Sequence, residues 1–128
     1  MFAADPTILL NAVKAAIDAG AGPGMLLIYT AVQPDPGAAI TDQTLLAALD
    51  LDKPCGVVAG AALTLSINED LSANNTGIAA WARITDSEGV WVADMDCGNE
   101  ASEAVLKLNS VQIAAGGTVK IGSAVITA

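Results

Sequence analysis

The stretch Ala79–Cys97, AAWARITDSEGVWVADMDC, contains the clearest β-hairpin pattern of the chain. Side chains alternate along it on both sides of a short polar loop that ends in Gly89. Such period-2 alternation around a glycine-ended loop is typical of two antiparallel strands. Asp86 can cap the turn with its carboxylate, and Gly89 can take the positive φ angle that closes it. Both tryptophans of the chain lie here, so we expect the rest of the sheet to form around this hairpin.

Other stretches have the length and composition of strands, and turn-forming residues separate them. Met25–Val32 is apolar on both parities, which predicts a strand that is covered on both faces. Thr44–Leu51 fits either a strand or a short helix, and we favour the strand because Asp52–Pro54 ends it. The remaining predicted strands are Val57–Ile67, with a bend or bulge at Gly60, Val105–Ala114, with a bulge near Asn109 and Ser110, and Thr118–Thr127. About seven short strands at this spacing predict a mainly β fold, an antiparallel β-sandwich of the jelly-roll type with one N-terminal α-helix.

The predicted helix occupies Asp5–Gly20. Asp5 is a typical N-cap residue, and Pro6 stands at the first helical position, where its missing N–H is tolerated. Six apolar residues at helical spacing predict the stripe that packs on the sheet: Ile8, Leu9, Ala12, Val13, Ala16 and Ile17. The four residues before the helix are Met1, Phe2, Ala3 and Ala4. They form either an arm that contacts a neighbouring molecule or an unstructured chain end, and we assign them as candidate partner-contact residues.

The length of 128 residues predicts one domain, with the arm and helix over residues 1–22 and the sheets over residues 23–128. Fourteen acidic and five scattered basic residues give a net charge of −9, which disfavours binding to nucleic acids and to anionic membranes. The first residues lack the basic and apolar regions of a secretory signal, so we expect synthesis and retention in a cytoplasm. Cys55 and Cys97 are interpreted as small buried apolar residues in preference to a structural disulfide.

The sequence offers few candidates for catalysis or metal binding. It contains no histidine, which excludes Ser-His-Asp and Cys-His nucleophiles and metal sites with histidine ligands. Asp94 and Asp96 lie two residues apart on one predicted strand and therefore on one face. They form a paired-carboxylate site, a calcium site with Asn99 and Glu100, or a solvated hairpin end, and we favour the solvated end. The same alternatives apply, with weaker support, to Asp50 and Asp52.

The aromatic residues raise a separate possibility. Tyr29, Trp81 and Trp91 are candidates for stacking on sugar rings, but sugar-binding modules usually expose more aromatic side chains than this chain contains. We therefore favour core packing for at least two of the three. Arg83 is the only base in the hairpin, and we expect it to pair across the strands with an acidic side chain.

Four stretches, taken together and in order, resemble a family of small virion proteins of tailed bacteriophages. They are GPGMLLIYTAVQP at Gly22–Pro34, TLLAALDL at Thr44–Leu51, TGIAAWARITDSEG at Thr76–Gly89, and the segment Asn109–Val119. The resemblance covers nearly the whole chain.

This resemblance implies a structural protein and no enzyme, with no catalytic residues, metal or cofactor. It implies a capsid decoration (cement) protein that binds the outside of the major capsid protein lattice and stabilises it. The expected partners are the major capsid protein and further copies of the chain, as a dimer or trimer, and the expected location is the capsid surface after assembly in the host cytoplasm. The alternatives are a neck, tail or baseplate component and a sugar- or calcium-binding β-sandwich module.

Overall fold

The hairpin that the sequence predicts is present. In the computed structural model, which describes residues 5–127, strand β5 (Trp81–Thr85) pairs antiparallel with β6 (Trp91–Asn99). The Asp86 carboxylate accepts hydrogen bonds from the backbone N–H groups of Glu88, at 2.9 Å, and Val90, at 3.0 Å. Gly89 has a φ of +85°, as the turn requires. The predicted roles of Asp86 and Gly89 are therefore confirmed.

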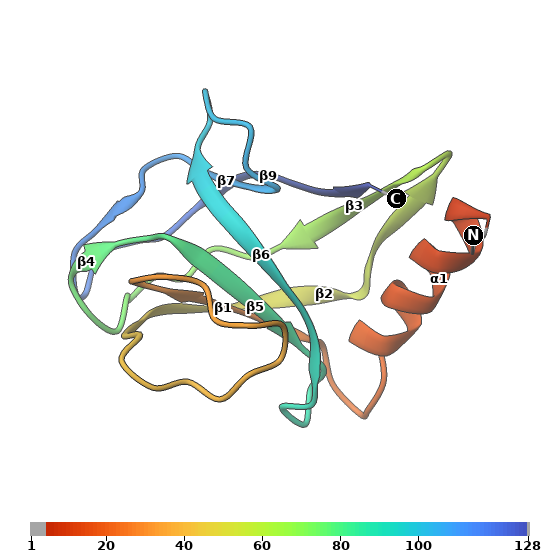
Figure 1. Ribbon diagram of the computed structural model, residues 1–128, viewed down its shortest axis with the longest axis horizontal. Coiled ribbons are helices and arrows are strands. Elements are labelled where there is room, and N and C mark those ends of the chain that lie inside the picture. The colour runs from red at the N-terminus through yellow and green to blue at the C-terminus, as the bar shows by residue number, and fades with distance from the viewer. Residues whose placement is uncertain (1–4, 128) are drawn as a thin grey trace.

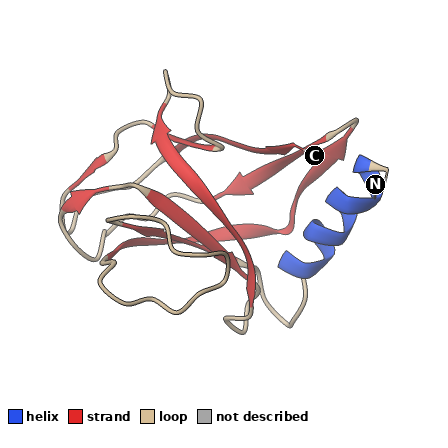
Figure 2. Ribbon diagram, in the orientation of Figure 1, coloured by secondary structure: helices blue, strands red, loops and turns tan. Residues whose placement is uncertain are grey.

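Seven strands form a closed barrel in the order β1-β2-β3-β9-β7-β6-β5, and a separate pair, β4-β8, lies at one end (Figure 1). One helix, α1, lies beside the strands at the opposite end (Figure 2). The remaining elements are α1 Pro6–Ile17, β1 Met25–Tyr29, β2 Leu45–Ala59, β3 Ala62–Ile67, β4 Gly77–Ile78, β7 Leu106–Leu108, β8 Gln112–Ile113 and β9 Ile121–Thr127.

The predicted open sandwich is wrong, because two long strands each take part in two different pairings. The 15-residue strand β2 pairs with β1 along its first half and with β3 along its second half. Its register shifts between Leu51 and Gly56, so the Asp52–Pro54 segment continues the strand instead of ending it. Strand β6 similarly pairs antiparallel with β5 and then, from Cys97, parallel with β7. Because β9 joins β3 to β7 and β1 pairs with β5, every strand of the ring has two neighbours and the sheet closes into a barrel.

Two predicted strands are divided in the structure. The stretch Val57–Ile67 contains a turn at Gly60, whose φ is +60°, so its two halves belong to β2 and β3. The stretch Val105–Ala114 gives β7 and then β8, and β8 leaves the barrel to pair with β4. The bulge expected near Asn109 and Ser110 is therefore a break between two strands in different sheets.

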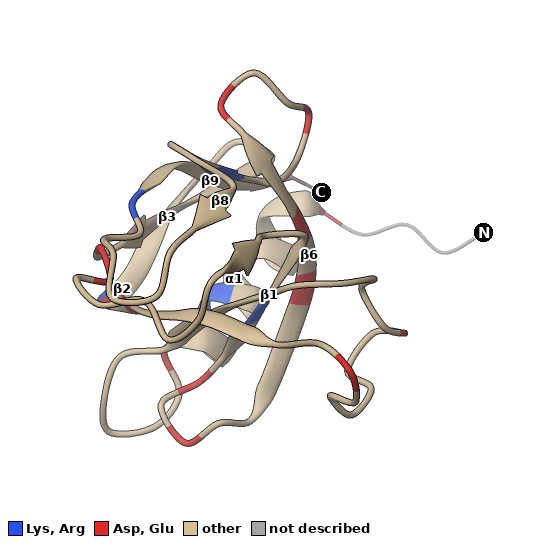
Figure 3. Ribbon diagram, turned by 90° about the vertical axis from the view of Figure 1, so that its left-hand side faces the viewer, with Lys and Arg blue, Asp and Glu red and all other residues tan. Residues whose placement is uncertain are grey.

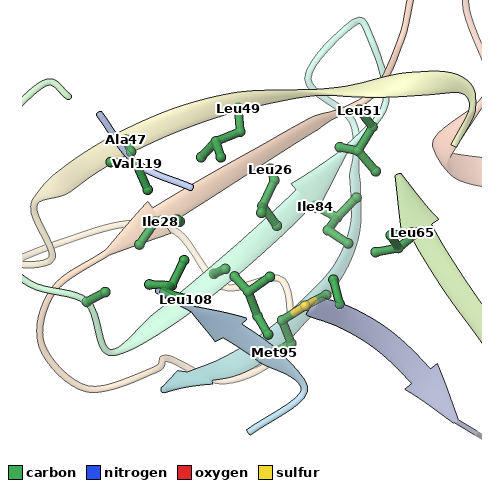
Figure 4. Close-up of a cluster of buried hydrophobic side chains, with 14 of the residues drawn as sticks. Leu26, Ile28, Ala47, Leu49, Leu51, Leu65, Ile84, Met95, Leu108 and Val119 are labelled. Atoms are coloured by element: carbon green, nitrogen blue, oxygen red, sulfur yellow. The ribbon is translucent and has the colours of Figure 1, made fainter. Parts of the chain in front are cut away.

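The core fills the barrel with aliphatic side chains that alternate along the strands. Figure 4 shows them pointing toward one another from β1, β2, β3, β5, β6 and β7. The largest fully buried members are Leu26, Ile28, Leu46, Leu49, Leu51, Leu63, Ile84, Leu106 and Leu108. Gly56 allows β2 and β3 to approach closely, because a Cβ atom there would lie 2.1 Å from the Thr64 carbonyl oxygen.

Helix α1 begins as the sequence predicts and is attached to β2 near both ends. The Asp5 carboxylate accepts a hydrogen bond from the Thr7 N–H at 2.8 Å, which confirms the N-cap. The Thr7 hydroxyl donates to the Gly60 carbonyl at 3.2 Å. At the other end, the Asp18 carboxylate accepts a hydrogen bond from the Cys55 N–H at 2.9 Å. These contacts place the helix along the second half of β2.

The buried face of α1 differs from the predicted stripe. Leu10 and Ile17 are buried in the core, and Val13 packs against them. Four of the six predicted stripe residues are instead exposed: Ile8, Leu9, Ala12 and Ala16. The helix is apolar around most of its circumference, so its sequence pattern does not specify a single inward face. The candidate arm Met1–Ala4 lies outside the described residues.

Candidate functional site

Strand β5 is buried on both faces, and its outward side chains Trp81 and Arg83 form hydrogen bonds with the loop after β1 and with β6. Ala82 and Ile84 point into the core, whereas Trp81, Arg83 and Thr85 point outward and are nevertheless buried. The long loop of residues 30–44, between β1 and β2, contacts this outer face (Figure 1). We call Arg83, Asp94, Trp81, Tyr29 and Trp91 the outer cluster.

An ion pair between β5 and β6 forms the centre of the outer cluster. Arg83 and Asp94 are cross-strand partners, and their side chains form two parallel hydrogen bonds, Nε to Oδ1 at 2.7 Å and Nη2 to Oδ2 at 3.1 Å. Arg83 Nη2 also donates to the Ala38 carbonyl at 2.8 Å, and the Gly37 N–H donates to Asp94 Oδ2 at 3.1 Å. The expected cross-strand partner of Arg83 is thus confirmed, and the pair fastens the loop of residues 30–44 to the barrel.

Three aromatic rings surround this ion pair. Tyr29 and Trp81 stack with centroids 4.8 Å apart, and the Arg83 guanidinium lies 5.3 Å from the centroid of the Trp81 ring. The Trp81 indole N–H donates to the Thr30 carbonyl at 3.2 Å, and that of Trp91 donates to Asp94 Oδ1 at 3.0 Å. Trp81 and Tyr29 are buried and Trp91 is exposed, so the expectation that at least two of the three pack inside is confirmed.

The exposed position of Trp91 results from an irregularity in β6. Ile84 pairs with Ala93, whereas Thr85 pairs with Trp91, so Val92 is an extra residue in the ladder. Val92 packs against the core, and Trp91 lies on the outer face together with Asp94. Simple alternation places Trp91 and Asp94 on opposite faces, and for this reason the sequence pattern misses the outer cluster.

The charge states of Arg83 and Asp94 in the outer cluster suit a structural role. Burial raises the pKa of Asp94, but the hydrogen bonds from Arg83, the Gly37 N–H and the Trp91 indole outweigh it and leave that pKa below its ordinary value. The hydrogen bond to Asp94 raises the pKa of Arg83. Both groups are therefore charged at neutral pH and are bound to each other. A carboxylate in this state is a poor proton donor or acceptor for catalysis.

The other candidate carboxylates are not assembled into a site. Asp96 is exposed, as expected for a solvated hairpin end, and its Oδ1 accepts a hydrogen bond from the Val105 N–H at 3.0 Å. The side chain of Asp94 is only 1% exposed, so the expectation that Asp94 also lies on a solvated hairpin end is wrong. Asp52 accepts a hydrogen bond from Asn68 at 3.0 Å. Within residues 5–127, no three Asp, Glu or Cys side chains are placed to hold a metal ion.

A shallow, open hollow of about 420 Å³ lies beside the β4-β8 pair, at the end of the molecule away from α1. Its lining contains no charged side chain and consists of Thr76, Gly77, Ile78, Gln112, Ile113 and Ala114. The sequence did not predict it, because it forms between two segments that are far apart in the chain.

None of the described helices has the length and apolar character needed to cross a membrane.

The two cysteines are free thiols with suppressed acidity. Cys55 belongs to the core and Cys97 packs against it, in agreement with their interpretation as small apolar residues. Burial and the nearby Asp18 raise the pKa of Cys55 to about 11, and burial and Asp96 raise that of Cys97 to about 12. Because the thiolate is the nucleophile, neither thiol is activated for chemistry at neutral pH.

This suppression gives a direct prediction. At pH 8, we expect Cys55 and Cys97 in the folded protein to react with a disulfide reagent such as DTNB at least about a hundredfold more slowly than a free cysteine, whose pKa is about 8.5. The absorbance time course measures this rate, and both thiols should react rapidly after unfolding in guanidinium. Reaction of either folded-state thiol at the rate of the free amino acid contradicts the prediction.

The site that the described residues build is therefore a buried ion pair that secures a loop, accompanied by an uncharged hollow. Comparisons with protein-family models, with curated proteins and with solved structures found no match to this chain.

Proposed function

We propose that this chain is a structural protein of a tailed-bacteriophage virion, and that it decorates the outside of the capsid by binding the major capsid protein. The observation that carries the proposal is the arrangement of the four stretches that resemble small virion proteins. Gly22–Pro34 contains β1, which pairs on one side with the β2 portion of Thr44–Leu51 and on the other with β5 of Thr76–Gly89. Asn109–Val119 contains β8, which pairs with β4 of Thr76–Gly89. The four stretches thus form one connected unit.

The physical properties of the fold suit this function. A closed barrel with a fastened loop is a rigid scaffold, which loses little conformational entropy when it binds a lattice. A net charge of −9 keeps bound copies soluble and limits their random association. Attachment at many equivalent sites, or as a dimer or trimer, lets each individual contact be modest because multivalent binding adds avidity.

The copy number in purified particles tests this proposal. We expect about one copy for each major capsid subunit, as required of a protein that follows the symmetry of the lattice. Quantitative mass spectrometry against the major capsid protein measures the ratio, and heating of particles with and without the protein tests the stabilisation of the capsid. A handful of copies indicates a neck, tail or baseplate component instead, and absence from particles overturns the virion proposal.

A further inference from the structure

The middle of the loop of residues 30–44 contributes nothing to the apolar core. None of residues 33–42 is buried, and eight of these ten residues are exposed. The core cluster contains none of them. Figure 1 shows the loop as a wide excursion between β1 and β2. Because burial of apolar surface is the main source of folding stability, residues 33–42 are held in place by other contacts. We call residues 33–42 the strap.

The two ends of the loop are joined to each other by hydrogen bonds. The Thr30 N–H donates to the Thr44 carbonyl at 3.1 Å, and the Thr44 N–H donates to the Thr30 hydroxyl at 3.0 Å. The Gln43 side-chain amide donates to the Val32 carbonyl at 3.1 Å. We call these three contacts the neck. The chain therefore leaves β1 and enters β2 through one closed point, which separates the strap from both strands.

The strap is bound to the barrel at its tip. The Gly37 N–H donates to Asp94 Oδ2 at 3.1 Å, and the Ala38 carbonyl accepts from Arg83 Nη2 at 2.8 Å. We call these two hydrogen bonds the latch, and within residues 5–127 no other hydrogen bond joins the strap to a barrel strand. Both end on the Arg83–Asp94 ion pair, and Figure 3 marks the acidic positions of β6 in red. The side chains of Arg83 and Asp94 are only 10% and 1% exposed.

A tight turn gives the latch its shape. The Ala38 N–H donates to the Asp35 carbonyl at 2.9 Å, and Pro36 and Gly37 occupy the two central positions of this turn. Proline followed by glycine is the preferred pair of a type II turn, and Gly37 has the positive φ, +74°, that its position requires. A Cβ atom at Gly37 would lie 3.2 Å from two atoms of the Trp91 ring. Glycine is therefore needed both for the turn and for its contact with Trp91.

From these contacts we infer that the strap is a latched flap, which opens as one unit about the neck while the barrel stays folded. Closing the strap orders ten residues, and it is offset by two hydrogen bonds and the contact of Gly37 with Trp91. Opening breaks no strand pairing, so it requires less free energy than global unfolding. The open form exposes the Arg83–Asp94 ion pair to solvent. The inference does not depend on the virion function.

Hydrogen exchange of the ¹⁵N-labelled full chain, followed by NMR, tests the inference. The reference is the N–H of Leu51, a buried residue, which donates to the Gly24 carbonyl at 3.0 Å. We expect the N–H at position 37 to be protected at least about a hundredfold less than that of Leu51. Its exchange should not respond to low urea, because opening exposes little surface, whereas that of Leu51 should accelerate. The Thr30 N–H in the neck should be protected at least about tenfold more than position 37.

Gly37→Ala and its control Gly116→Ala test the latch directly. Gly116 has a similar φ, +80°, but a Cβ atom there meets nothing within 4 Å, and it lies in the turn before β9. Both variants therefore introduce backbone strain, but only Gly37→Ala disturbs the contact with Trp91. We expect Gly37→Ala to lower the protection of position 37 at least about tenfold, and Gly116→Ala to change it by about twofold or less.

Three results overturn the inference. The first is a position 37 that is as well protected as Leu51 in the wild type, and the second is equal protection of position 37 and Thr30. The third is an equal effect of Gly37→Ala and Gly116→Ala on position 37. The first two comparisons use only the wild-type protein, so they hold even if a variant fails to fold, which circular dichroism detects. None of these results bears on copy number in particles, so the virion proposal is tested separately.

Discussion

Replacement of Trp81 by alanine is expected to lower the free energy of unfolding by about 4 kcal/mol. Trp81 is fully buried, stacks on Tyr29 and donates its indole N–H to the Thr30 carbonyl. Its removal leaves a cavity between the barrel and the loop of residues 30–44, and it deprives the half-buried Thr30 carbonyl of its donor.

Urea unfolding monitored by circular dichroism measures this change, and Trp91→Ala is the matched control. Trp91 is the other tryptophan of the hairpin, but its ring is exposed. We expect its replacement to cost about 1 kcal/mol, mainly through the lost hydrogen bond to Asp94. If the two variants lost equal free energy of unfolding, the burial of Trp81 under the loop of residues 30–44 would not be a source of stability, contrary to this prediction.

The second large effect is expected from Asp94→Ala, at about 3 kcal/mol of lost stability at pH 7. This change leaves the Arg83 guanidinium buried without its partner, and it removes the acceptor for the Gly37 N–H and the Trp91 indole. Because Gly37 belongs to the loop of residues 30–44, we also expect faster hydrogen exchange and proteolysis in that loop.

Asp96→Ala is the control for this variant, since Asp96 stands two residues farther along β6 on the exposed part of the strand. Its loss should cost about 1 kcal/mol or less. The double variant Arg83→Leu, Asp94→Leu should be more stable than Asp94→Ala, because it leaves no unpaired buried charge. A double variant that is less stable than the single one would contradict the assignment of the loss to the orphaned guanidinium.

The contribution of Asp94 also has a defined pH dependence. Its pKa is lower in the folded protein than in the unfolded chain, where it is about 4. The unfolded state therefore binds the proton first, so the stabilisation is fully present above pH about 4 and is lost as the pH falls through the folded-state value. The stability difference between wild type and Asp94→Ala should accordingly shrink in acid, as urea titrations at pH 7 and pH 3 will show.

Several local features were predictable because they depend on neighbouring residues. The N-cap at Asp5 and the turn at Asp86 and Gly89 follow from contacts within a few positions of the chain, and this short turn brings β5 against β6. The sequence predicted that Arg83 pairs with an acidic side chain across the strands. The identity of that partner, Asp94, became clear only from the register of the hairpin. The outer cluster as a whole was missed, because the extra residue Val92 reverses the alternation and brings Trp91 to the face of Asp94.

The sequence by itself determined a single β-rich acidic chain with one capped helix and one well-defined hairpin, because alternation, capping and turn chemistry act over short distances. Only the tertiary structure decided that the sheet closes into a barrel, since closure depends on the pairing of β1 with β5 and of β3 with β9, which lie far apart in the chain. It also decided which side of α1 is buried. A helix that is apolar on most sides has no inward face until the barrel against which it packs has formed.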